Sequence, residues 1–183
     1  MDCPLCELAQ SPEKKLYEDD HVFCILNTGP AAPGQVIAAP KQHATILEQL
    51  SPGIGGFLFV VATKMAEALY AALDTGGTNI LVQNGGSAGQ TTPHIMVHII
   101  PRMDNDGLGL TWTPRELSEE ALDAVRKQVK EALATLPEEK EYRSQSDGAE
   151  GSAGKREPPS QPVLPEHLAW EDNLMKHLKR RMP

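Results

Sequence analysis

The chain has 183 residues, a formal net charge of −8 and 40% apolar residues, a composition typical of a solvated globular protein with room for one domain of ordinary size. The negative charge excludes a broad nucleic-acid-binding surface, which needs clustered Lys and Arg. No run reaches the roughly 20 apolar residues that cross a bilayer, and the Met-Asp-Cys-Pro start lacks the pattern of a signal peptide. We therefore expect a cytoplasmic protein with no transmembrane segment.

A pair of cysteines near the N-terminus indicates a metal site. Cys3 and Cys6 are separated by two residues, the spacing of paired zinc ligands, whereas Cys24 lies in an apolar run and is expected to be a small buried core residue. Such a pair can also be a redox site, usually at a helix start beside a βαβ unit. The sequence shows neither feature clearly, so zinc is the favoured interpretation.

The first third of the chain predicts a β-hairpin with a stiff connection. Residues 19–26 and 36–39 form extended apolar segments, and Pro40 closes the second of them. Between them lies Gly29-Pro-Ala-Ala-Pro-Gly34, which is dense in turn formers. We expect the two segments to pair.

A helix follows the hairpin. Ser51 and Pro52 give a helix-start signal, and apolar residues recur at helical spacing over 57–73. Asp74-Thr-Gly-Gly77 then ends the helix, and residues 78–83 predict a strand.

The strand over 78–83 leads into a glycine-rich loop, residues 84–90, that could hold a phosphate. The next residues form an apolar, β-branched run in which His94, Met96 and His98 occupy alternate positions. On a strand, residues two apart share one face. The pattern therefore predicts that two imidazoles and a thioether point the same way beside the loop.

The C-terminal third predicts one more helix and then a change of character. Thr113 is the expected cap, Pro114 the first helical residue and Glu116 the partner in a capping box. One face then carries apolar residues at steps of three and four, ending before Pro137: Leu117, Ala121, Val125, Val129, Ala132 and Leu136. We expect a domain over residues 1–137.

Residues 138–162 are rich in Ser, Gly, Glu and Pro and predict a flexible linker. Residues 163–183 have the apolar spacing of a short amphipathic helix, with acidic residues before basic ones. Such a short helix is marginal alone, so we expect it to dock. Its own domain or a twin subunit, a foreign partner, and a membrane surface are the three alternatives.

Two further ligands would complete a tetrahedral zinc site. His43 and His94 are the candidates to join Cys3 and Cys6. Two thiolates and two imidazoles leave no open position for water, so the site would be structural. It would attach the N-terminal segment to the core.

Together these residues resemble the histidine triad (HIT) family, whose signature is three histidines at alternate positions followed by apolar residues. The resemblance rests on Gly89-Gln-Thr-Thr-Pro-His94, His98 and the Ile-Ile-Pro-Arg that follows it, and upstream segments occur in the order the family uses: Leu26-Asn27, Pro33-Gly34-Gln35-Val36, Pro40-Lys-Gln-His43 and Val82-Gln83-Asn84-Gly85. It covers roughly residues 1–112. Cys3, Cys6, His43 and His94 match the zinc ligands of a microbial branch of that family.

The resemblance implies an α+β fold, the HIT-like fold, in which helices flank an antiparallel sheet. It also implies a homodimer and a purine nucleotide whose phosphate lies beside the histidine strand. By position, Asn27 would bind the ribose and His98 would contact the phosphate or orient the site. Four further residues would surround the α-phosphate: Gln83, Gly89, Gln90 and Thr91.

Met96 departs from the family pattern, because active members carry the nucleophilic histidine at that position. A thioether is a weak acceptor with no proton to exchange, so it cannot form the covalent nucleotidyl intermediate. Three explanations are open: an engineered inactivation, a natural departure that keeps nucleotide binding, and altered catalysis in which His98 or a substrate group takes over.

The favoured function is therefore a HIT-family purine nucleotide-binding protein with a structural zinc ion and a deficient hydrolase or transferase reaction. One alternative is a weak or altered hydrolase of a nucleotide phosphoramidate or a dinucleotide polyphosphate. Another is an interaction module that captures a protein or ribonucleoprotein partner through residues 163–183.

Overall fold

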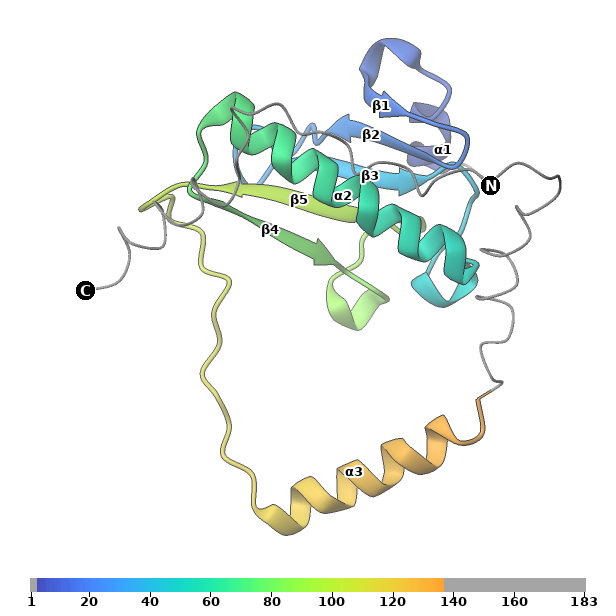
Figure 1. Cartoon of the computed structure of the whole chain (residues 1–183), viewed down its shortest axis with the longest axis vertical. Helices are drawn as coiled ribbons and strands as arrows, with labels where there is room; N and C mark the ends of the chain where they lie inside the picture. Colours follow the sequence, from blue (N-terminus) through green and yellow to red (C-terminus); the bar gives the residue numbers. More distant parts are fainter. Residues whose placement is uncertain (1–2, 137–183) are drawn as a thin grey trace, which may run out of the picture. The chain divides into compact units, whose positions relative to one another are not determined.

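The computed structural model describes residues 3–136; the linker predicted over 138–162 and the tail predicted over 163–183 lie outside these residues. Five antiparallel strands form one sheet in the order β1-β2-β3-β5-β4, with a long helix across one face (Figure 1). The strands are β1 Lys15–Glu18, β2 Val22–Leu26, β3 Val36–Pro40, β4 Gly77–Val82 and β5 Val97–Arg102. The helices are α1 Pro4–Leu8, α2 Pro52–Leu73 and α3 Glu119–Leu133, with short 3-10 turns η1 Pro12–Lys14, η2 Leu47–Gln49 and η3 Gly86–Ala88. The expected α+β class is confirmed.

The predicted hairpin is present as β2 and β3, but its first strand begins at Val22 rather than at Asp19. The Asp19 carboxylate accepts hydrogen bonds from the backbone N–H groups of His21 and Val22, at 2.7 and 2.8 Å. An Asp side chain used in this way fixes a turn. The turn separates β2 from β1, a strand that the sequence analysis did not predict.

The connection between β2 and β3 depends on Gly34. Its φ is +87°, and a Cβ atom there would lie 2.5 Å from Cδ1 of Leu73. Only glycine combines that backbone conformation with so little space. Directly after it, the backbone N–H of Gln35 donates to Ala32 and the Gln35 carbonyl accepts from Asn27. These contacts fix the register of the hairpin.

Helix α2 begins and ends where the sequence predicts. The Ser51 hydroxyl accepts from the backbone N–H of Ile54, and Asp74 takes the left-handed conformation, with φ at 51°, at the C-terminus. One face packs on the sheet through buried residues Leu58, Val61, Ala62, Met65 and Leu69. They contact the core residues of the strands, including buried Cys24, as expected.

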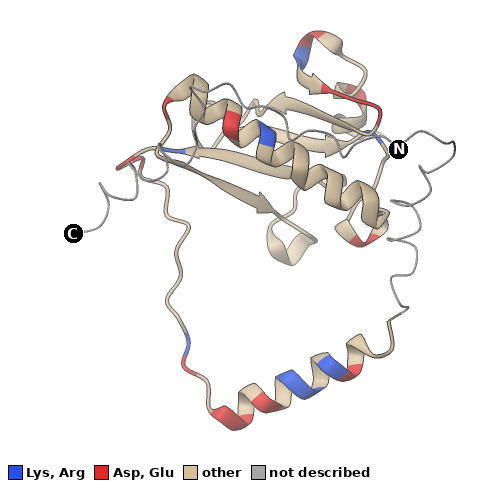
Figure 2. Cartoon of the chain, viewed as in Figure 1, with Lys and Arg blue, Asp and Glu red and all other residues tan. Residues whose placement is uncertain are grey.

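The opposite face of α2 stays apolar and exposed. Phe59 and Val60 are exposed, and Lys64 and Glu67 are the helix's charged residues (Figure 2). Among the described residues, α2 is long and apolar enough to cross a membrane by length and composition alone. A helix that packs on a protein core meets the same length and composition criteria, and α2 packs on the sheet through one of its faces.

Helix α3 begins five residues later than the sequence analysis predicts. Ser118 is the cap, because its hydroxyl accepts from the backbone N–H of Ala121, and Glu119 and Glu120 follow in the first turn. Acidic side chains there interact favourably with the positive end of the helix dipole. The capping box expected at Thr113 and Glu116 is wrong. No residue of α3 is buried, so tertiary packing does not extend the helix beyond the start that the Ser118 cap specifies.

Candidate functional site

Four side chains from three separate segments gather into one cluster. Cys3 and Cys6 come from the N-terminal cap and first turns of α1, His43 from the loop after β3, and His94 from the loop before β5. Their ligand atoms all lie within 4.8 Å of one another. The Cys6 Sγ atom is 3.3 Å from Nδ1 of His43 and 3.5 Å from Nδ1 of His94, and Cys3 Sγ is 3.4 Å from the latter.

These separations fit a tetrahedral metal ion. Zinc–sulfur bonds of about 2.3 Å and zinc–nitrogen bonds of about 2.0–2.1 Å place adjacent ligand atoms roughly 3.6 Å apart in a tetrahedron. The observed 3.3–3.5 Å requires only a small outward adjustment. The four residues predicted as ligands could therefore hold one metal ion.

The surroundings of His94 prepare it as a ligand. Its Nε2–H donates to the carbonyl oxygen of Pro40 at 3.0 Å, which leaves Nδ1 without a proton and facing the thiols. A backbone carbonyl in this position commonly orients a metal-bound imidazole. His94 is fully buried, and burial lowers its pKa, so the imidazole is neutral as a ligand must be.

The three positions of the histidine run share one face, as predicted: Ile95, Val97 and Ile99, which alternate with them, pack in the cluster under α2, whereas Met96 packs in the second cluster with Cys3 and Cys6. β5 begins at Val97, so His94 and Met96 precede the strand. The backbone N–H of Ile95 donates to Ala44, a contact with the loop that carries His43. His94 thus meets the Cys cluster, and Met96 and His98 line a cavity, all on the side of the sheet away from α2.

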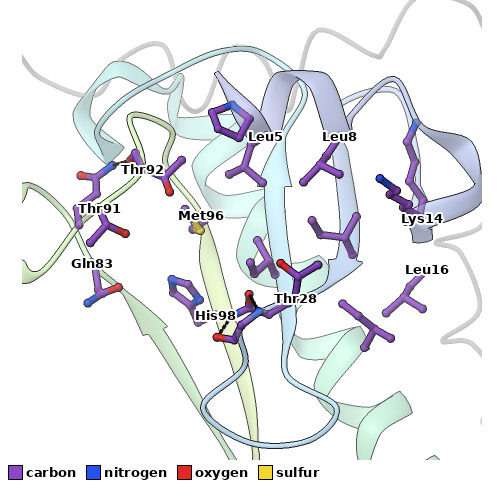
Figure 3. A pocket seen from close by; sticks show the side chains of 18 of the residues that line it. Leu5, Leu8, Lys14, Leu16, Thr28, Gln83, Thr91, Thr92, Met96 and His98 are labelled. Carbon is purple, nitrogen blue, oxygen red and sulfur yellow. Dashed lines mark hydrogen bonds between the residues drawn. The ribbon is translucent and has the colours of Figure 1, made fainter. Parts of the chain in front are cut away.

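That cavity has a volume of about 680 Å³ and two unlike walls. Figure 3 shows Gln83, Thr91 and Thr92 along one wall and Leu8, Leu16 and Lys14 along the other, with Met96 and His98 near the polar wall. Apolar residues of α1 and of the β2–β3 hairpin complete the second wall: Leu5, Ile25, Leu26 and Ile37. A small molecule with a flat apolar part and a polar or charged end fits such a site.

Most of the predicted nucleotide residues line this cavity: Asn27, Gln83, Gln90, Thr91 and His98. Gly89 does not line it and instead supports Gln83. The φ of Gly89 is +86°, and a Cβ atom there would lie 2.6 Å from Nε2 of Gln83. Glycine at this position lets the loop pass close behind the glutamine side chain.

The side chain of Gln90 is used by the loop itself. Its Oε1 accepts from the backbone N–H of Gly85 at 2.7 Å, and its Nε2 donates to the carbonyls of Thr45 and Thr92 at 2.6 and 2.9 Å. Both amide hydrogens therefore have acceptors. Thr91 has no hydrogen-bond partner within residues 3–136, so its hydroxyl and backbone N–H are available to a ligand.

His98 lies on β5, which runs between β3 and β4, and its side chain faces the cavity. Nε2 of Gln35 donates to its Nδ1 at 3.1 Å, and burial lowers the pKa of the imidazole. The sequence analysis assigned no role to Gln35. The sequence analysis also missed Leu5 and Leu8 as cavity residues. Their positions on either side of Cys6 could have indicated this, because contact between the cysteines and His94 brings them to the sheet.

Comparisons with known proteins agree with this geometry. The HIT domain family model matches residues 9–105. The chain is 36% identical over 144 residues to the adenylylsulfatase HINT3 of Arabidopsis thaliana, covering 75% of this chain and 73% of that protein. A histidine triad nucleotide-binding protein from Candida albicans superposes with a TM-score of 0.66 at 27% identity, covering 74% of this chain and all of that one. A Zn-bound histidine triad family protein from Mycobacterium smegmatis gives 0.56 at 30% identity, covering 72% and 98%.

Substituting Gly89 tests whether the loop depends on close backbone packing. Gly89→Ala should lower the free energy of unfolding by about 1–2 kcal/mol, because alanine would adopt a left-handed conformation and displace Gln83. Urea denaturation measures this. Gly86→Ala is the matched control, since Gly86 has no positive φ and its added Cβ would meet nothing within 4 Å. Equal effects of the two substitutions would show that the loop does not need glycine at position 89.

Proposed function

Because the chain belongs to the histidine triad (HIT) family, we propose that it binds a purine nucleotide in the cavity beside His98 and performs the family's nucleotidyl reaction slowly or not at all. The observation that carries this proposal is the composition of the cavity. It keeps the polar wall of a phosphate site but presents a thioether, Met96, where the family has its attacking imidazole.

The two walls assign the parts of a nucleotide. The apolar wall from α1 and the hairpin would take the base, and Asn27 at the end of β2 would bind the ribose. Thr91, with its free hydroxyl and backbone N–H, would hold the phosphate together with Gln83 and His98. Neutral donors of this kind compensate phosphate charge when their positions are fixed in advance.

Met96 makes the site one for binding rather than turnover. Its side chain packs against the apolar cluster that includes Leu5 and Phe23. A thioether supplies no nucleophile that can be regenerated after attack on phosphorus. The second candidate function, slow hydrolysis of a nucleotide phosphoramidate or dinucleotide polyphosphate, is favoured by one observation: His98 lines the same cavity, and burial lowers the pKa of its imidazole.

Nucleotide titrations separate the two functions. The wild-type chain should bind AMP in isothermal titration without hydrolysing an AMP phosphoramidate, and Met96→His should gain activity by about two orders of magnitude or more, because a covalent nucleophile is restored. His98→Ala is the discriminating control. Clear wild-type turnover that is lost in His98→Ala would overturn the binding role in favour of altered catalysis.

The same proposal includes a structural zinc ion held by Cys3, Cys6, His43 and His94. The tetrahedral fit of their ligand atoms supports it, as does the Zn-bound family member described above. Zinc would bind all four ligands and leave no position for substrate, so it would supply attachment rather than chemistry.

Zinc content provides the test. Cys3→Ser/Cys6→Ser should reduce bound zinc from about one ion per chain to none and lower the melting temperature, because metal affinity in such sites contributes directly to folding. Cys24→Ala is the matched control, since Cys24 is buried between β2 and α2, away from the cluster, and its loss should leave zinc content unchanged. Zinc-free wild-type protein would contradict the proposal.

A homodimer is also part of the proposal. Exposed apolar residues lie on the outer face of α2, on edge strand β4 and along α3, including Val60, Ile80 and Val125. Exposed apolar side chains and an open strand edge are features of protein interfaces, and the interfaces of homo-oligomers are most often two-fold.

Sedimentation velocity tests this association. Val60→Lys should shift the protein from dimer to monomer, because a charge would replace an apolar side chain at the centre of the α2 face. Gln10→Lys, an exposed substitution after α1, should leave the dimer intact. A monomeric wild type would refute the proposal. Capture of a partner by residues 163–183 and the cytoplasmic location stay predictions.

A further inference from the structure

A buried glutamine connects the β2–β3 turn to the cavity histidine. Gln35 is 4% exposed. Its Oε1 accepts from the backbone N–H of Ala31 at 2.7 Å, and its Nε2 lies 3.1 Å from Nδ1 of His98. Because Gln35 and Ile37 are two apart along the extended chain, both face the cavity side of the sheet, where Ile37 pairs with His98.

The Ala31 contact decides which way round the glutamine amide lies. A backbone N–H can only donate, so the atom facing Ala31 must be the amide oxygen. The reversed amide would place its NH₂ group 2.7 Å from that N–H, with two donors opposed and neither satisfied. The NH₂ group of Gln35 therefore points to His98, and Nδ1 of His98 must accept.

We propose that Gln35 is a positioning residue that holds His98 in the tautomer with its proton on Nε2, so that the cavity presents a fixed N–H donor to an oxyanion such as the phosphate of a nucleotide. The proposed function supplies only the identity of that anion. The hydrogen-bond geometry supplies the tautomer. Within residues 3–136, Gln35 is the one hydrogen-bond partner of the His98 side chain, so the Nε2–H of His98 is available to a ligand.

The charged surroundings leave this arrangement undisturbed at neutral pH. β3 and β4, which flank His98, carry no titratable side chain. The charged residues of the cavity lining are Glu13, Lys14 and Lys15, and Lys15 pairs with Glu18 at 2.8 Å. Burial lowers the pKa of His98, and among the described residues no carboxylate pairs with the imidazole to raise that pKa.

The tautomer also bears on the chemistry of the site. An imidazole attacks phosphorus through a nitrogen lone pair, and on the cavity side that lone pair would be absent because Nε2 carries the proton. The basic nitrogen, Nδ1, faces Gln35 instead. Gln35 would thus favour His98 as a hydrogen-bond donor and disfavour it as a substitute for the nucleophile missing at Met96.

Nitrogen NMR of the full-length, zinc-loaded protein tests the tautomer without any ligand. Long-range ¹H–¹⁵N spectra of histidine-labelled wild type should show His98 with a proton on Nε2 and none on Nδ1 at neutral pH. The isosteric change Gln35→Glu keeps the acceptor for Ala31 but offers His98 a carboxylate. It should put a proton on both nitrogens and raise the pKa of His98 by about 1 to 3.

Gln128→Glu is the charge-matched control, because Gln128 lies exposed on α3 and does not line the cavity; it should leave the His98 spectrum and pKa unchanged. An Nδ1-protonated His98 in the wild type would overturn the proposal. A His98 pKa in Gln35→Glu equal to that of the wild type would also overturn it. A purely structural role of Gln35 predicts no rise in the pKa of His98.

AMP titration then separates this role from the nucleotide site. Gln35→Leu should weaken AMP binding about tenfold, the effect expected for loss of one oriented hydrogen bond to a charged group, while Gln128→Glu should bind as the wild type does. An Nε2-protonated His98 in a protein that fails to bind AMP would support the positioning role and refute only the nucleotide site. Unchanged AMP affinity in a folded Gln35→Leu would overturn the donor role.

Discussion

The contact between the N-terminal cysteines and His94 is the constraint on which the cavity depends. α1 has five residues, too few to be stable alone, and Cys3 and Cys6 hold it against the sheet. Leu5 and Leu8, between and beside those cysteines, then form part of the apolar wall. The Cys–His cluster therefore supports the apolar wall together with the packing of Leu5 on Phe23 and Ile25, although no residue of the Cys–His cluster lines the cavity.

The five residues from His94 to His98 serve both the Cys–His cluster and the cavity from one face of the sheet. His94 turns towards the cysteines because the loop before β5 is held to the β3 side by Ile95 and Ala44. Two residues later, Met96 already lines the cavity, and β5 carries His98 beside it. All three side chains lie on one face, because Ile95, Val97 and Ile99, which alternate with them, pack under α2. The Cys–His cluster and the cavity are thus separated by position along this segment and not by the two faces of the sheet.

Much of this organisation was predictable from the sequence, and the failures have a common cause. Ser51, Pro52 and Asp74 specify α2 through local chemistry, and the spacing of Cys3 and Cys6 points to a metal site before any fold is known. The turn at Asp19 and the start of β5 were missed because each depends on particular hydrogen bonds that apolar alternation does not encode. Gln35 was missed for the same reason: its importance arises from Ala31 and His98, one local and one 63 residues away.

In the proposed function, Gln35 and Met96 both disfavour the nucleotidyl reaction. A nucleotidyl transfer needs a nitrogen lone pair aimed at phosphorus, and Met96 removes the side chain that would supply it. His98 is the imidazole that lines the cavity, but with the proposed tautomer its lone pair lies towards Gln35 and its N–H towards the cavity. Restoring chemistry through His98 would require breaking the Gln35 contact and leaving a buried amide without its acceptor, which is costly. The bond between Gln35 and His98 need not break when a ligand is only bound, because a phosphate oxygen can accept directly from the Nε2–H of His98. The proposed binding role therefore rests on two positions, Met96 and Gln35.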